Sequence, residues 1–397
     1  MSVIRPGDRP ARRPRVSRGR RCAASAVLAL SIAGSSLATP YTPKDDAQVL
    51  AELPAGARHA TAPSRDLTRT RLDIALPLVQ FDISRARATG DLRFLGYGEA
   101  ILLPWLNRTP VSPQVLILHA TILQSRHQFD AALGELDQAL KMRPDDPQAW
   151  LTRATVLRVV GRYPEALESC GHLAAAADPA ILVLCTQSVE GLGGHLKSAY
   201  AAVVALPQQS MPPEARAWRY SELGEMAERL GDDPAAEHWL REGLQVAPDD
   251  FYLRGACADL LLRHERAAET LELLRGYESM EPMLLRITIA HQQLHDGAGA
   301  RSRALLQNAF DLEQQRGDAV HRREQARFFL DVDRQPAAAL AAARENWQVQ
   351  REPDDVLILL RAARAAGQPQ LAAPAFEFLH QHRLEDARAL LAGGPAP

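Results

Sequence analysis

The chain has 397 residues, of which 46% are hydrophobic and 24% charged, a balance typical of globular proteins and unlike that of disordered or fibrous chains. Aromatic residues make up only 5%, and alanine, leucine and arginine are common, so the periodic segments favour helix over strand. The formal net charge is only -2, which hides an uneven distribution along the chain. We expect an all-α fold without a substantial β-sheet.

The N-terminal segment is basic and then apolar. Eight arginines and one aspartate precede the uncharged run at residues 22–38. This layout predicts a signal peptide at residues 1–38, because small residues at Ser36 and Ala38 suit cleavage after Ala38. Its apolar core is shorter than the ~20 residues that a membrane span needs. An uncleaved inner-membrane anchor, a twin-arginine route through Arg20 and Arg21, and a cytosolic protein with a basic tail are the alternatives.

Cleavage would change the charge of the protein. Residues 1–38 carry +7, so the mature chain would carry about -9. An acidic domain has no general attraction for nucleic acid or anionic lipid. We therefore expect no nucleic-acid partner, and membrane contact only through an uncleaved N-terminal segment.

The remainder of the chain divides by composition and periodicity. We expect a linker at 39–64, a divergent N-terminal helical pair at 65–112, a repeat region at 113–392 and a disordered tail at 393–397. The linker is rich in proline, alanine and glycine. Helical periodicity within the divergent pair covers residues 72–89 and 92–106.

From Pro113 onward the chain aligns with itself at a period of 34 residues. Four residues recur at this spacing: Pro113 as Pro147, Ala120 as Ala154, Phe129 as Tyr163 and Ala132 as Ala166. Within a repeat, two small residues lie twelve apart, on either side of a turn. Several of these turns hold a glycine: Gly161, Gly194, Gly231 and Gly367.

This pattern predicts a helical hairpin in each repeat. Small residues on facing helices let the two backbones approach closely, and glycine in the turn permits a positive φ. Proline separates the repeats, since it fits the first turn of a helix but cannot continue one. The PDD motifs at Pro144, Pro248 and Pro353 are expected to supply aspartates that cap the next helix.

The segment PQAWLTRATVLRVVGRYPEALESCGHL, residues 147–173, resembles a tetratricopeptide repeat. The family's marked spacings are filled by Trp150, Ala154, Leu157, Gly161, Tyr163 and Ala166. The resemblance covers roughly residues 110–380 and implies a right-handed superhelical solenoid of about eight antiparallel helix-turn-helix repeats. It does not imply one task, because this fold serves many unrelated functions.

The resemblance also implies a concave groove lined by the first helix of each repeat. From the spacing we expect ten residues to face a partner there: Ile117, Thr121, Gln124, Leu151, Thr155, Arg158, Ser221, Glu225, Glu228 and Asp259. The later part of this set is acidic, which predicts a protein or peptide partner with a basic segment. Alternatively, these carboxylates only solvate the helices, or they are neutralised by Arg229, Arg263 and Arg286.

One functional subclass of the family grips a peptide's terminal carboxylate with lysine and asparagine. The corresponding positions here hold Ile117, Thr121, Leu151 and Thr155. We therefore do not expect a clamp for a terminal carboxylate.

Catalytic motifs are absent from the sequence. There is no phosphate loop, dinucleotide fingerprint, nucleophile elbow or HExxH pair. His291 and His295 are four residues apart and could share a helix face as metal ligands, but no third ligand is evident. We expect no enzymatic activity, cofactor or metal, and keep a metal-dependent enzyme as an alternative.

Four cysteines are present, and Cys22 lies in the expected signal. Cys170 and Cys185 fall on helices that are expected to pack together, so they could form a disulfide in an oxidising compartment. The alternative is that all three remaining cysteines are small buried hydrophobic residues.

These observations predict a non-catalytic interaction scaffold that is exported to a bacterial cell envelope, periplasmic or secreted. The bacterial origin is inferred from the signal layout and from the excess of arginine over lysine. An accessory or assembly subunit of a membrane-bound complex is the alternative, and it would retain the N-terminal segment.

Overall fold

The computed structural model describes residues 65–207, 211, 213–316 and 322–392. The predicted signal at 1–38, the linker at 39–64 and the tail at 393–397 lie outside this part of the chain. In the described residues the secondary structure is helical, with no strand, as the sequence predicted. None of the described helices is both long and apolar enough to cross a lipid bilayer.

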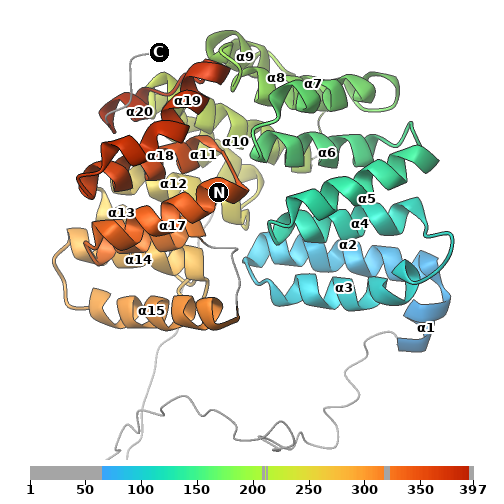
Figure 1. Cartoon of the computed structure of the whole chain (residues 1–397), viewed down its shortest axis with the longest axis horizontal. Helices are drawn as coiled ribbons and strands as arrows, with labels where there is room; N and C mark the ends of the chain where they lie inside the picture. Colours follow the sequence, from blue (N-terminus) through green and yellow to red (C-terminus); the bar gives the residue numbers. More distant parts are fainter. Residues whose placement is uncertain (1–64, 208–210, 212, 317–321, 393–397) are drawn as a thin grey trace, which may run out of the picture. The chain divides into compact units, whose positions relative to one another are not determined.

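The helices follow one another as antiparallel pairs (Figure 1). A short α1 (Arg65–Thr70) precedes α2 (Leu72–Thr89) and α3 (Arg93–Leu106), which correspond to the divergent pair. Four further pairs are α4 (Pro113–Ser125) with α5 (Phe129–Met142), α6 (Pro147–Val159) with α7 (Tyr163–Gly171), α8 (Pro179–Glu190) with α9 (Leu196–Val204), and α10 (Pro213–Leu230) with α11 (Asp233–Val246).

The C-terminal half continues this arrangement with less regular helices. Its pairs are α12 (Phe251–Arg263) with α13 (Ala267–Leu273), α14 (Glu281–Gln293) with α15 (Gly299–Arg316), α16 (Arg322–Arg327) with α17 (Pro336–Val349), and α18 (Pro353–Ala365) with α19 (Ala373–His382). A π-helical turn, Phe328–Val332, extends α16, and the five-residue α20 (Ala387–Leu391) follows α19. Eight pairs therefore follow residue 113.

The small residues lie where the paired helices cross. Ala120, Ala132 and Ala166 are fully buried, and Ala154 is 2% exposed. At Gly224, a Cβ atom would lie 2.6 Å from the Cδ2 of Leu240 on the facing helix α11. The approach of α10 to α11 thus requires glycine at this position.

The turns of the hairpins share one backbone conformation. Gly161, Gly194, Gly231 and Gly367 have φ angles of 80°, 87°, 79° and 67°, as the glycine pattern predicted. The same left-handed conformation occurs without glycine in four other hairpins, at His127, Glu265, His295 and Arg334. The turn geometry is therefore more regular than the sequence that forms it.

Aspartates cap several of the following helices. The side chain of Asp146 accepts hydrogen bonds from the backbone N–H groups of Gln148 and Ala149, and that of Asp250 accepts one from Leu253. The third PDD motif differs, because Glu352 is the cap of α18 and Asp355 completes a capping box from inside the first turn. The capping prediction is thus confirmed at two of the three motifs.

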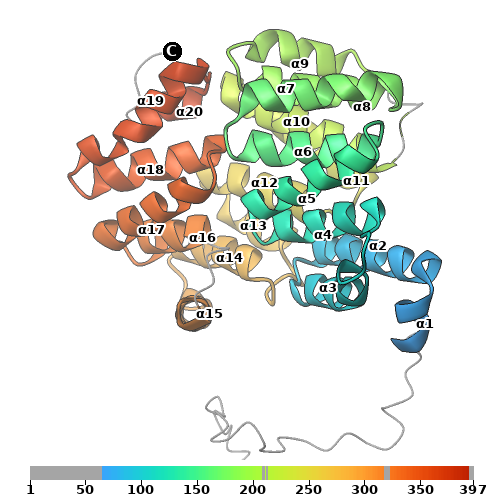
Figure 2. The same cartoon turned by 45° about the vertical axis from the view of Figure 1, so that its right-hand side comes forward.

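The solenoid is wound so tightly that its later repeats pack on its earlier ones. The backbone N–H of Arg351 donates to the carbonyl of Val159, 2.8 Å away. The turn at Gly161 lies against the ring of Phe378, and the turn at Gly90 lies against Phe251. Figures 1 and 2 show α18, α19 and α20 beside the helices α6 to α10. One hydrophobic cluster joins residues of α4 to α8 with residues of α17 to α19.

Candidate functional site

The first helices of the repeats carry the residues that the sequence assigned to a groove. We call their shared side the inner face, and define it by Arg158 of α6, Glu222, Glu225 and Glu228 of α10, and Asp259 of α12. These residues form ion pairs or hydrogen bonds with neighbouring first helices or with the C-terminal segment. Side chains of the protein itself therefore connect the residues of the inner face with one another and with the C-terminal segment.

The N-terminal part of the predicted groove is largely closed. Ile117 is 4% exposed and Thr121 is 6% exposed, and the hydroxyl of Thr121 donates to the carbonyl of Ile117 at 2.9 Å. Gln124, at the end of the same helix, is half-buried. On α10, Ser221 is 8% exposed and donates to the carbonyl of Trp218. A role for these residues in partner binding stays a prediction.

A small cavity lies between α6, α8 and α10. Its volume is about 50 Å³, and its walls are Leu151, Ala154, Thr155, Arg158, Cys185, Ser188, Val189 and Trp218. Three of these residues, Leu151, Thr155 and Arg158, belong to the predicted groove. The structure thus brings one part of the predicted set together around a space that can receive a small side chain.

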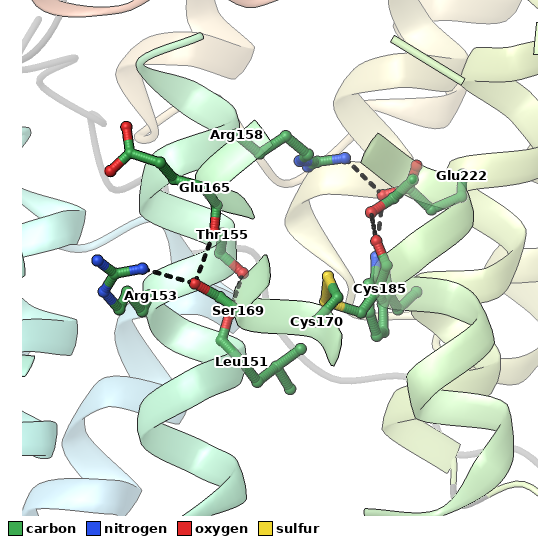
Figure 3. Close-up of a disulfide and its surroundings, with 11 residues drawn as sticks. Leu151, Arg153, Thr155, Arg158, Glu165, Ser169, Cys170, Cys185 and Glu222 are labelled. Carbon is green, nitrogen blue, oxygen red and sulfur yellow. Dashed lines mark hydrogen bonds and ion pairs between the residues drawn. A yellow bond between two sulfur atoms is a disulfide. The ribbon is translucent and has the colours of Figure 1, made fainter. Parts of the chain in front are cut away.

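A buried ion pair bounds this cavity. Nη1 of Arg158 lies 2.7 Å from Oε1 of Glu222, a carboxylate that also accepts a hydrogen bond from the indole N–H of Trp218 at 2.9 Å (Figure 3). The side chain of Glu222 is only 3% exposed, and that of Arg158 is 21% exposed. A charge-assisted hydrogen bond of this kind fixes the guanidinium in place. Glu222 and Trp218 were not predicted from the sequence, although their four-residue spacing on α10 could have indicated a shared helix face.

Below the cavity, Cys170 of α7 and Cys185 of α8 form a disulfide, with their Cα atoms 5.6 Å apart (Figure 3). The bond links the second helix of one hairpin to the first helix of the next. Both residues are at most 2% exposed. Cys257 is a free, buried thiol, and burial raises its pKa to about 11.

Arginines of the chain neutralise much of the acidic part of the inner face. Asp259 pairs with Arg286 and, at 2.7 Å, with Arg327. Burial works to raise the pKa of Asp259, but the two arginines outweigh it and hold the pKa at about 2. Glu228 lies 2.8 Å from Arg263. Arg263 and Arg286 are thus the neutralising partners that the sequence offered as an alternative to partner binding.

Arg229 does not neutralise a carboxylate in this way. Its Nη1 donates to the carbonyl of Gly191, 2.6 Å away, at the C-terminal end of α8. The partial negative charge of a helix C-terminus favours a cation there. The charge of Arg229 also works to lower the pKa of Glu225, so the expectation that this arginine neutralises acidic groove residues holds as an electrostatic effect without a direct contact.

Glu225 differs from its neighbours because its hydrogen-bond partner is neutral. The hydroxyl of Tyr252, at the start of α12, donates to its carboxylate. Burial and the nearby charge of Glu222 raise the pKa of Glu225 to about 7, against the opposing influence of Arg158. Glu225 thus changes its charge near neutral pH.

The two candidate metal-binding histidines do not share a helix face. α14 ends at Gln293, so His295 lies beyond the helix, with a φ of 54°. Nδ1 of His291 lies 2.9 Å from Asp296. Within the described ranges, no group of three or more His, Cys, Asp or Glu side chains is placed to hold a metal ion.

Comparison with known proteins gives likeness of fold only. No protein-family model matches the chain, and no curated protein matches it. Among solved structures, it resembles a thermophilic tetratricopeptide-repeat protein of Thermus thermophilus, with 22% identity, 47% of this chain and 100% of that chain covered, and a TM-score of 0.38. It also resembles PilF of Pseudomonas aeruginosa, with 17% identity, 52% of this chain and 96% of that chain covered, and a TM-score of 0.38.

A third similar structure is a tetratricopeptide-repeat protein of Parabacteroides merdae, with 16% identity, 66% of this chain and 98% of that chain covered, and a TM-score of 0.36. Because these scores are low, the assignment of the fold rests on the chain itself. Its paired helices, buried alanine and glycine crossings, left-handed turns and initial prolines recur through the described repeats. In its fold, the described chain is an all-α solenoid of antiparallel helix pairs, the architecture that its resemblance to tetratricopeptide repeats implied.

Proposed function

We propose that this protein is a non-catalytic scaffold of the bacterial cell envelope, which holds a segment of a partner protein against α6, α8 and α10. The observation that carries the proposal is the cavity between these helices, because three residues of the sequence-predicted groove meet there. Its walls combine apolar surface from Leu151 and Val189 with the polar groups of Thr155 and Arg158. This combination suits a side chain anchored by apolar contact and oriented by a few polar groups.

Export is supported by two independent features of the chain. The N-terminal residues have the layout of a secretory signal, and the structure contains the disulfide between Cys170 and Cys185. Disulfides persist in oxidising compartments such as the periplasm and are rare in the cytosol. N-terminal sequencing of the protein from fractionated cells, with thiol alkylation before lysis, tests this part of the proposal. An N-terminus at Thr39 and two cysteines protected from alkylation are the expected result, and free thiols in a cytosolic protein would contradict it.

Site-specific photo-crosslinking tests the binding surface. A crosslinking residue at Thr155 is expected to capture the partner, whereas the same residue at the exposed Glu168 of α7 should not. Arg158→Ala should weaken capture from position 155, because it removes a polar group from the cavity wall. Equal capture from both positions would show that the cavity is not the binding surface.

The proposed partner segment carries a basic residue. Two of the carboxylates that would receive it, Glu228 and Asp259, are already paired with arginines, so binding there requires that one of these arginines can leave. Arg388 meets this requirement best, because it belongs to the five-residue α20 and pairs with Glu228 at 3.2 Å.

A further inference from the structure

The last residues of the described chain bind across earlier repeats as a peptide ligand would. We call residues 384–391 the tail, which is distinct from the predicted disordered tail at 393–397. Oε2 of Glu385 accepts a hydrogen bond from the backbone N–H of Leu196, the first residue of α9, at 3.0 Å. Nη1 of Arg388 lies 3.2 Å from Glu228 of α10 and 3.1 Å from Asp354 of α18. The tail thus contacts three helices through two charged side chains three residues apart.

Apolar contacts complete this docking. Leu384 is 4% exposed and Ala389 is 3% exposed. The turn at Gly231 lies beside Ala387, where an added Cβ would come within 3.3 Å of the Cβ of Ala387. The receiving surface therefore offers a helix N-terminus for a carboxylate, two carboxylates for a guanidinium and a close approach for a small residue.

The tail is short and follows a break in the helical structure. It follows Arg383, whose φ of 51° marks a break after α19, and it forms only the five-residue α20. Leu390 is 41% exposed and Leu391 is 81% exposed, so part of its apolar surface has no cover in the described structure. Its release would break the contacts of Glu385 and Arg388 with α9, α10 and α18 and would uncover Leu384 and Ala389. Local openings of this kind occur at free energies below that of global unfolding.

We propose that the surface formed by the N-terminus of α9, Glu228 and Asp354 is a binding site for a partner segment with the spacing Leu-Glu-x-x-Arg, and that the tail occupies it as a competing internal ligand. The recognised chemistry is a carboxylate for the α9 backbone N–H, an arginine three residues later for the paired carboxylates, and a leucine before the carboxylate. This site is distinct from the cavity at Thr155. The inference deepens the proposed function and rests on it, since Glu228 is one of the carboxylates that would receive the basic residue of the partner. Its test does not depend on crosslinking from position 155, so the two can fail separately.

A peptide of residues 383–392 is the probe. The host is the full chain with Glu385→Gln and Arg388→Ala, which weakens the internal ligand but leaves the receiving surface unchanged. Fluorescence anisotropy should show the peptide binding at least tenfold more tightly to this host than to wild type. Adding Asp354→Asn to the host should reduce the affinity at least tenfold, and so should replacing the arginine of the peptide by alanine. Higher salt should weaken binding, since the contacts are ionic.

Failure of the peptide to bind the folded host, or equal binding by the host with Asp354→Asn, would overturn the proposal. Circular dichroism must first show that the host unfolds cooperatively. Native-state hydrogen exchange of the unaltered chain gives an independent readout that needs no variant. Amides of the tail should exchange by local opening, faster than those of α18. Exchange of the tail only through global unfolding would make it a fixed structural cap and would contradict the proposal.

Discussion

Two sets of hairpins in this molecule reach the same geometry from different sequences. We call the first set marked, because the turn residue with a positive φ is glycine: α6/α7, α8/α9, α10/α11 and α18/α19. In the unmarked set, α4/α5, α12/α13, α14/α15 and α16/α17, the corresponding residues are His127, Glu265, His295 and Arg334. All eight turns have a positive φ.

The comparison shows that packing of the paired helices, rather than glycine, imposes the turn. A non-glycine residue in the left-handed region costs about 1 to 2 kcal/mol, and four hairpins bear this cost. Glycine instead leaves space beside the turn for a neighbouring repeat. Gly161 and Gly194 lie against Phe378 and Arg383 of the later repeats, so a side chain there would block contact between successive windings of the solenoid.

The largest effect is expected where a marked turn meets a later repeat. Gly161→Ala should lower the free energy of unfolding by about 3 kcal/mol, because it adds left-handed strain to an overpacked contact. The new Cβ would lie 2.6 Å from the ring of Phe378.

Gly367→Ala is the matched control for this change. Its φ is also positive, at 67°, but an added Cβ would meet nothing within 4 Å. The loss should be only about 1 kcal/mol, the strain alone. Urea denaturation of the two variants measures the difference. Equal losses would show that the contact between windings contributes nothing.

The disulfide should matter almost as much, because it ties the short second helix α7 to the first helix of the next hairpin. α7 has 9 residues, whereas α5 and α11 have 14 each. Closing a loop of this separation, 15 residues, stabilises a fold by about 3 kcal/mol. The double variant Cys170→Ala and Cys185→Ala should lose that amount in urea denaturation. Wild type should lose a similar amount on reduction, while Cys257→Ala should remain sensitive to the reductant. A wild type unaffected by complete reduction would contradict the role of this bond.

Glu225 lies where the marked hairpin α10/α11 meets the unmarked α12/α13, and its effect depends on pH. Its pKa is about 7 in the folded chain, above the ordinary value of 4.5. A carboxyl with a raised folded pKa stabilises the fold fully below pH 4.5, and this stabilisation is lost as pH rises through 7. Glu225→Gln stays neutral and should escape the loss. Relative to wild type, its free energy of unfolding should increase by about 2 kcal/mol between pH 5 and pH 8.

A matched control for this pH dependence is Glu272→Gln, since the side chain of Glu272 is 67% exposed. Its stability relative to wild type should change little over the same range. Both differences come from urea denaturation at several pH values. If the free energy of unfolding of Glu225→Gln changed with pH in the same way as that of wild type, then Glu225 would not be the group that titrates.

The helix pairs of the repeats were predictable from the sequence. They could be predicted from two signals, proline at the start of a helix and small residues where two helices cross, because both act within one repeat. Proline begins α4, α6, α8 and α18. The divergent pair was predicted at nearly its observed bounds from apolar periodicity alone. The unmarked turns escaped notice, since nothing in the identity of Glu265 or Arg334 signals a positive φ.

The inner face was predictable only in part, for a related reason. Its residues could be chosen by helical spacing, and partners in the adjacent repeat, such as Arg263 and Arg286, could be anticipated, but other partners come from distant repeats. Arg388 meets Glu228 across 160 residues of sequence, and Arg327 meets Asp259 across 68. No periodicity within a repeat predicts such pairs, because they depend on how tightly the solenoid winds. For the same reason, Ile117 and Thr121 lie buried where an open groove was expected.

The smallest effect tests the unmarked turns directly. Glu265→Gly should raise the free energy of unfolding by about 0.5 to 1 kcal/mol, because glycine relieves left-handed strain but adds entropy to the unfolded chain. Glu265 is exposed, so little packing is lost. Ala304→Gly, at an exposed position inside α15, should lower it by about 1 kcal/mol, since glycine has no advantage in a helix. Urea denaturation measures both changes in the free energy of unfolding. An increase for Glu265→Gly and a decrease for Ala304→Gly would show that the unmarked turn is strained. A lower free energy of unfolding for both variants would mean that the turn conformation is favourable for the Glu265 side chain. The two sets of hairpins would then differ in more than the space around the turn.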